Sequence, residues 1–142
     1  MIVVDDHHLF AALARRAMGE TVPEDAEPLL TTSSWYYRLA RAAHDPAFVG
    51  ALSRRIAALD DAPRGDLLDM LDALPDEIGL LSPRLLVPVM AKLSESVRLN
   101  HLGAEAVASA ILVDGSLRVV AASPVLEAAC GQFGIELSVA PV

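Results

Sequence analysis

The first residues of the chain combine a short apolar run with side chains that can bind metals or move protons. Residues 2–4 are Ile-Val-Val, and Asp5, Asp6, His7 and His8 follow directly. Carboxylate oxygens are hard ligands that suit magnesium, whereas mixed nitrogen and oxygen ligands suit manganese, zinc or nickel. The start of the chain therefore raises two alternatives: a metal-binding catalytic edge, or only the beginning of a helix.

The histidines by themselves favour the helix start over a zinc site. Adjacent residues at a helix start point in different directions, so one ion would not take both His7 and His8. His44 and His101 lie far away in the sequence and have no ligand spacing to this pair. We therefore interpret Asp6 as the helix N-cap and the two histidines as partly exposed first-turn residues.

The elements that must position these residues alternate between strands and helices. Short apolar or β-branched runs predict strands at residues 2–4, 29–31 and 78–81, and in the later segments LRVVAA and IELSV. Apolar residues at helical spacing predict helices between them. Because strands joined by helices of this length pair in parallel, residues 1–142 are predicted to form one α/β domain. We expect three α/β/α layers with a mostly parallel central sheet of four or five short strands.

Capping residues and prolines predict where the helices begin and end. Ser33 or Ser34 can cap the helix that follows the second strand. A helix over residues 45–61 would have Asp45 as its N-cap, and the following DAPRG segment would be a break. The longest helix is predicted in residues 82–99, with serine at its start and an internal proline that falls in its early turns or kinks it.

The carboxyl ends of parallel strands meet at one edge of a sheet, where sites in such folds gather. Asp5 and Asp6 follow the first predicted strand, Ser33 follows the second, and Ser123 follows LRVVAA. We expect these separate segments to converge on that edge.

Composition and charge restrict the function classes. The chain of 142 residues has a formal net charge of −8, so a surface that binds nucleic acid must be local. No apolar run approaches the roughly 18 residues of a membrane span, and no secretory signal is predicted. A cytoplasmic location is the expectation. The single Cys130 rules out an intramolecular disulfide, and we interpret it as a core residue.

Arginine supplies nearly all of the positive charge. It occurs in close pairs, at Arg15 with Arg16, Arg38 with Arg41, and Arg54 with Arg55, while Lys92 is the one lysine. Arginine suits bidentate contacts to phosphate or carboxylate, and an aromatic neighbour such as Tyr37 can stack on a base or anchor a partner. The alternative is that these are solvated helix faces. Arg15, Arg38, Arg41 and Tyr37 are the candidate contacts to nucleic acid or a partner.

Several segments together resemble a PIN-domain protein, particularly the VapC-type toxins of bacterial toxin–antitoxin pairs. They are IVVDD with its apolar helix, LLTTSSWYYRLAR, GAEAVASAILVDGSLRVVAASPVLEAA and the closing GIELSV. The resemblance covers nearly the whole chain and is most specific at its two ends. It implies a ribonuclease that depends on magnesium or manganese, with a cluster of acids at the carboxyl edge of a parallel sheet. Divalent metals suit that reaction because they neutralise the scissile phosphate and activate water.

The resemblance implies a metal site that this chain retains only in part. Asp5 matches the first aspartate of the family, and Glu105 stands where the family commonly has an aspartate, so these two are the candidate catalytic residues. Asp6, in place of a small hydroxyl residue, is a third candidate metal ligand. The glutamate expected near residues 36–38 is absent, and Ser123 stands at a degenerate position where the family often has aspartate. An arginine at residue 38 would compete with an ion.

Two hypotheses from different classes follow. The first is a PIN-like ribonuclease restrained by an antitoxin protein, with Asp5 and Glu105 on the ion and Asp6 assisting. The second is a PIN-like module of weak or lost nuclease activity that acts by binding RNA, a protein partner or itself. The high apolar content makes a homodimer an expectation in either case.

Overall fold

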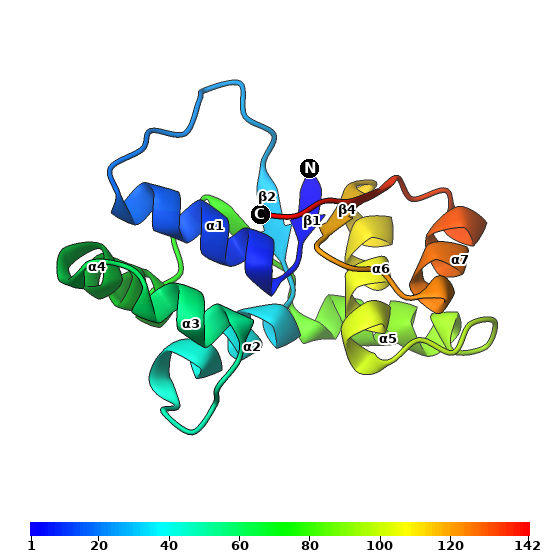
Figure 1. Cartoon of the computed structure of the whole chain (residues 1–142). Coiled ribbons are helices and arrows are strands. Elements are labelled where there is room, and N and C mark those ends of the chain that lie inside the picture. The colour runs from blue at the N-terminus through cyan, green and yellow to red at the C-terminus, as the bar shows by residue number, and fades with distance from the viewer.

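A computed structural model of residues 1–142 shows an α/β fold with seven helices and a five-stranded sheet (Figure 1). All neighbouring strands pair in parallel, in the order β3-β2-β1-β4-β5. The predicted three-layer α/β/α architecture is confirmed. The strands are β1 (Ile2–Val4), β2 (Leu29–Thr31), β3 (Ile78–Leu80), β4 (Ser116–Val119) and β5 (Leu137–Val139).

The helices lie in two groups on opposite sides of the sheet (Figure 1). Those of the first half pack in one hydrophobic cluster and those of the second half in another, except that Trp35 of the first half packs in the second cluster. The first half contains α1 (Asp6–Ala17), α2 (Ser33–His44), α3 (Ala51–Ala57) and α4 (Asp61–Asp72); the second contains α5 (Pro83–Leu93), α6 (His101–Val113) and α7 (Pro124–Phe133).

The central strand β1 is buried on both faces, as its uninterrupted apolar run requires. Val3 packs in the cluster of the second helix group, whereas Ile2 and Val4 pack in that of the first. The neighbouring strand β4 lies between β1 and β5, with Leu117 and Val119 in the second cluster, and Arg118 between them points to the other face. The face of β4 that carries Arg118 therefore does not contribute an apolar side chain to the first cluster.

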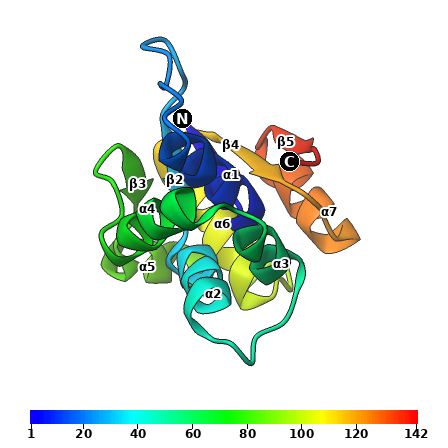
Figure 2. The ribbon, with the colours of Figure 1, turned by 60° about the vertical axis from the view of Figure 1, so that its left-hand side comes forward.

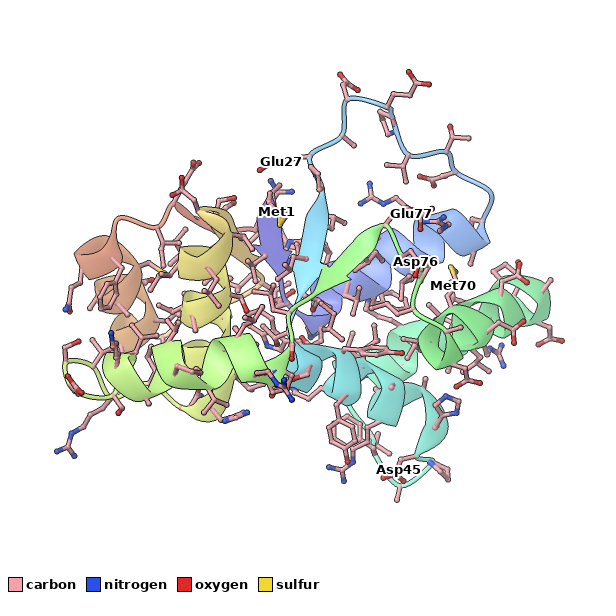
Figure 3. All side chains as sticks on the ribbon, turned by 180° about the vertical axis from the view of Figure 1, so that it is seen from behind. Met1, Glu27, Asp45, Met70, Asp76 and Glu77 are labelled. Atoms are coloured by element: carbon pink, nitrogen blue, oxygen red, sulfur yellow. The ribbon has the colours of Figure 1, made fainter.

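The amino-terminal ends of two neighbouring strands are tied together by charge. The N-terminal ammonium of Met1, directly before β1, pairs with Glu27, which precedes β2 (Figure 3). A second pair joins Arg16 of α1 to Glu77, just before β3, at 2.8 Å. All of these ionic groups lie at the surface, so each pair contributes little to stability. No helix has the length and apolar character that crossing a bilayer demands.

Two predicted features of the helical middle are wrong. Residues 45–50 do not begin a helix, because Asp45 instead forms a turn in which its carboxylate accepts from the Ala47 N–H at 2.9 Å. The DAPRG segment is not a break but the first turns of α4. Pro63 is tolerated there because the N–H groups of a first helical turn have no partner within the helix.

The other helix starts agree better with the sequence. Ser82 caps α5 as predicted, and Ser123 caps α7. The long helix expected over residues 82–99 is shorter, since α5 ends at Leu93, and Pro88 lies inside it.

Candidate functional site

Four polar residues at the carboxyl edge of the sheet act as helix N-caps. Asp5, Thr32, Ser82 and Ser123 each follow a strand or its next loop, and each side chain accepts a hydrogen bond from a backbone N–H of the helix that follows. Helix starts leave such N–H groups without partners, and a capping oxygen satisfies one of them. The N-caps predicted at Asp6, and at Ser33 or Ser34, are therefore wrong: Asp5 and Thr32 have these roles.

Asp5 is the most heavily used of these side chains. Its Oδ1 accepts from the backbone N–H of His8 at 2.9 Å and lies 2.8 Å from the His8 ring nitrogen Nδ1. Its Oδ2 accepts from the N–H of Val120 at 2.7 Å, just beyond the end of β4. The side chain is buried, with a residue exposure of 4%. Asp5 thus joins the ends of β1 and β4 to the first turn of α1.

Asp6 faces an arginine. Its Oδ2 is 3.2 Å from the Arg38 Nε, but the two groups are not oriented for a hydrogen bond, and Oδ2 is buried without a hydrogen-bond partner. Burial raises the pKa of Asp6 above its usual range, and the guanidinium of Arg38 opposes that shift only in part. The positive charge beside this carboxylate therefore comes from the protein itself.

Glu105 reaches the same edge from the middle of α6 and meets the first turn of α2. It accepts from the Ser33 hydroxyl and from the Ser34 N–H, the latter at 3.1 Å. Burial acts to raise the pKa of Glu105, but the hydrogen bonds from Ser33 and Ser34 outweigh it, so the pKa lies below its ordinary value. A carboxylate at a helix start is also favoured by the helix dipole.

A cleft of about 520 Å³ opens beside these residues. It lies beyond the ends of β1 and β4 and beside the starts of α1, α6 and α7. Asp5, Asp6 and Ser123 line it, but Glu105 does not. Its positive charges are Arg38 and Arg98. Its apolar wall comprises Trp35, Leu99, Leu102, Val119, Val120, Ala121, Val125 and Leu126. We call this hollow the carboxyl-edge cleft.

No protein-family model and no curated protein matches this chain. The geometry of the cleft therefore carries the functional argument.

The residues present do not fit a divalent cation. No three His, Cys, Asp or Glu side chains are grouped so that they could hold one ion. Both carboxylate oxygens of Asp5 accept hydrogen bonds, and Glu105 accepts hydrogen bonds from the start of α2. The Asp6 carboxylate faces Arg38. A magnesium or manganese ion needs free carboxylate oxygens at an open position. Ser123, the degenerate position, adds no charge and uses its hydroxyl as a helix cap at 3.2 Å from the Leu126 nitrogen.

The two adjacent histidines point into different hollows, as the helix geometry predicts. His7 lines the carboxyl-edge cleft, while His8 lines a separate groove on the other side of α1. The His8 ring is also fixed by Asp5. They do not form a shared zinc site.

The four predicted contact residues do not converge. Arg38 lines the carboxyl-edge cleft, and Arg15 lines the separate groove beside α1. Arg41 lies over the Phe48 ring at 4.8 Å and pairs with the carboxylate of Asp45 at 3.4 Å. Tyr37 is 65% exposed, whereas its neighbour Trp35 is buried in the core.

Sequence reasoning missed two residues of the cleft. Arg98 and Asn100 precede α6, and Asn100 caps that helix by accepting from Gly103 N–H at 2.8 Å. The signal for Asn100 was present, since asparagine before a helical segment is a common N-cap. Arg98 had none, because it lies in a loop whose course is set by the packing of α5 and α6. Cys130 is buried as predicted, and burial raises the pKa of its thiol, which disfavours a reactive thiolate.

Proposed function

We propose that this chain is a PIN-like protein, related to the metal-dependent ribonuclease toxins of toxin–antitoxin systems, whose acidic site is incomplete and whose nuclease activity is weak or lost. On this proposal it acts as a binding module, and the ligand of the carboxyl-edge cleft is single-stranded RNA. The observation that carries the proposal is the use of all three candidate metal ligands within the fold: Asp5 and Glu105 in hydrogen bonds, and Asp6 beside Arg38.

The position of the acidic residues in the fold supports a relationship to such ribonucleases. The contacts of these residues do not support metal-dependent hydrolysis. Asp5 and Asp6 follow the first strand of a parallel sheet, and Glu105 meets the same edge, as the resemblance implies. Phosphodiester hydrolysis needs a metal or an equivalent to activate water and neutralise charge. The Arg38 guanidinium neutralises Asp6 but cannot supply an activated water.

Two features of the cleft favour an anionic ligand. Arg98 is exposed at its rim and forms no ion pair within the chain, and Arg38 is 45% exposed beside it. The starts of α6 and α7 also border the cleft, and helix starts attract phosphate groups. The apolar wall offers a surface on which a base can lie.

The same relationship implies further partners. An antitoxin-like protein and a second copy of this chain are both expected in the cytoplasm. Leu85 on α5 is 54% exposed, which makes that side of the helix a candidate for an interface. Sedimentation of the purified chain, with Leu85→Glu as the disrupting variant, tests for the homodimer.

RNA binding and cleavage can be tested in one experiment. A labelled single-stranded RNA is incubated with the chain in magnesium or manganese, binding is followed by fluorescence anisotropy, and the RNA is then run on a denaturing gel. We expect salt-dependent binding that Arg98→Met weakens several-fold, and RNA that stays largely intact. Arg84→Met is the control, since it removes the same charge from α5 outside the cleft.

Two results would contradict the proposal in different ways. Efficient cleavage that depends on Asp5 would mean that the nuclease site still assembles. Absence of any binding would remove RNA as the ligand of the cleft.

A further inference from the structure

A second hollow, of about 870 Å³, lies between α1, the end of α3 and the C-terminal segment. It shares no lining residue with the carboxyl-edge cleft. Phe10 of α1, Met18 directly after α1, Leu59 after α3 and Val142 at the C-terminus give it apolar walls. Met18 is 53% exposed and Val142 46%. An apolar surface of this kind is suited to covering by another molecule.

Three arginines line this hollow, which we call the arginine groove: Arg15, Arg55 and Arg118. No aspartate or glutamate side chain lines it, and none of the three arginines takes part in an ion pair. Glu20 and Glu27 border the smaller hollow on the far side of Arg15 and Arg118, but beyond ion-pair distance. In a chain with a net charge of −8, the groove is therefore a local concentration of positive charge.

The arginines are held in place rather than freely mobile. The guanidinium of Arg55 lies over the Phe10 ring, 4.8 Å from its centroid, and Arg118 is a half-buried residue of strand β4. The Arg15 Nε donates to the Ala11 carbonyl of its own helix at 3.4 Å. Preformed charges lose less conformational freedom when a ligand binds.

The floor of the groove is sheet surface that α1 borders at β4 but does not cover at β5. Arg118 of β4 and Ser138 of β5 are paired in register and both line the groove, while their neighbours Leu117 and Leu137 pack on the other face with α6 and α7. Parallel sheets are normally covered by helices on both faces. In Figure 2, β5 and the C-terminus lie at the edge of the molecule beyond α1. The groove therefore occupies the place of a missing helix.

We propose that the arginine groove binds an acidic amphipathic helix of a partner protein. Its apolar face packs against Met18, Leu59 and Val142, and its carboxylates pair with Arg55 and Arg118. A ligand of phosphates alone would leave the apolar walls uncovered. The chain's own acidic helix, α4, cannot serve from a second copy, because its Leu67 and Leu71 are already buried. The proposal does not rest on the function of the cleft.

The test uses the full chain and a synthetic amphipathic helix of about 18 residues. The peptide carries leucine at helical spacing, glutamate on the flanks and a fluorescein label, and a second peptide has lysine in place of every glutamate. We expect the acidic peptide to bind and the basic one not to bind, as measured by fluorescence anisotropy. The double variant Arg55→Met/Arg118→Met should weaken binding by about tenfold or more.

A matched control and an independent variant keep the test decisive. Arg54→Met removes the same charge from the neighbouring position of α3 outside the groove, and should change the affinity by less than about twofold. Met18→Glu places a repelling carboxylate on an exposed position of the wall, where folding is little affected, and should also weaken binding strongly.

Several results would overturn the proposal. They are no binding of the acidic peptide, equal binding of both peptides, or binding that neither the double variant nor Met18→Glu alters. A labelled RNA that binds with the same arginine dependence while the peptide does not would assign the groove to nucleic acid. A homodimer that the groove variants dissociate would assign it to a second copy.

Discussion

The carboxyl-edge cleft and the arginine groove lie on different parts of the sheet and use their charged residues in opposite ways. In and beside the cleft, Asp5 and Glu105 are hydrogen-bonded to helix starts, and Asp6 faces an arginine. In the groove, the arginines have no carboxylate partner within the chain. At the cleft, the carboxylates that could have bound a metal are thus occupied in contacts within the fold. At the groove, arginines with no catalytic motif around them are left without an ionic partner.

That difference can be tested by asking which residues stabilise the fold. Removing a charged side chain that satisfies buried backbone groups lowers the free energy of unfolding strongly. Removing one that is free to bind a ligand changes it little. The expected change in the free energy of unfolding on substitution decreases from Asp5, through Glu105 and Asp6, to the groove arginines.

The largest expected effect is that of Asp5→Ala. The substitution removes the α1 cap and leaves the buried N–H groups of His8 and Val120 without their acceptor. We expect the free energy of unfolding to fall by about 3 kcal/mol, measured by urea denaturation at neutral pH. A carboxylate kept for a metal would behave differently: in the metal-free protein its removal would leave stability unchanged or raise it.

Glu105→Gln should have the next largest effect. The glutamine keeps one oxygen acceptor but turns an amide NH₂ group toward a donor at the start of α2, so we expect a loss of about 1–2 kcal/mol. Because the hydrogen bonds lower the pKa of Glu105 in the folded state, its contribution is fully present above the ordinary glutamate value of 4.5. It is lost as the pH falls through the folded-state pKa. Urea denaturation of both proteins across this range should show the difference shrinking in acid; a constant difference would contradict the assigned role.

Asp6→Asn should act in the opposite direction. Burial raises the pKa of Asp6 despite Arg38, so the folded state binds its proton more tightly than the unfolded state does. The stability of the wild type therefore falls as the pH rises from the ordinary value of 3.8 through the folded-state pKa. Above that window we expect the variant to be more stable by up to about 1 kcal/mol, with the gain disappearing at lower pH. Thermal unfolding at several pH values measures it, and a destabilised variant at neutral pH would show that the Arg38 pair outweighs burial.

The smallest expected effect on folding is that of Arg118→Met. Arg118 makes no ion pair, and methionine can cover much of the same strand surface, so the free energy of unfolding should change by less than about 0.5 kcal/mol. Arg55→Met should cost slightly more because it loses the contact with Phe10. Chemical denaturation beside Arg54→Met gives the comparison. A loss as large as that of Asp5→Ala would mean that the groove arginines hold the fold and are not reserved for a partner.

The sequence predicted the sheet well because its strands carry a strong signal. The β-branched run at residues 2–4 and the helices between the strands imply parallel pairing, and β1, β2 and β3 lie where they were expected. Helix boundaries were less accurate because a cap depends on where the preceding strand ends. A shift of one residue moved the caps to Asp5 and Thr32, and local hydrogen bonds of Asp45 replaced a predicted first helical turn.

The candidate site was predictable only as a location. The sequence placed Asp5, Asp6, Ser33 and Ser123 at one edge. The cleft brings Asp5, Asp6 and Ser123 together, whereas Ser33 lies outside its lining and donates to Glu105. It could not indicate that Val120 N–H would use one oxygen of Asp5, or that Glu105 would turn to the start of α2, because both contacts join segments far apart in the chain. The arginine groove had no sequence signal, since it results from α1 reaching β4 but leaving the same face of β5 uncovered.

The central claim, that the carboxylates of the acidic edge are occupied by the fold itself and do not bind a metal, is tested most directly by calorimetric titration of manganese into the purified chain and into Asp5→Asn. We expect no saturable binding by the wild type up to millimolar manganese. Micromolar binding by the wild type that is lost in Asp5→Asn would contradict the claim and restore a metal-dependent nuclease as the function of the cleft.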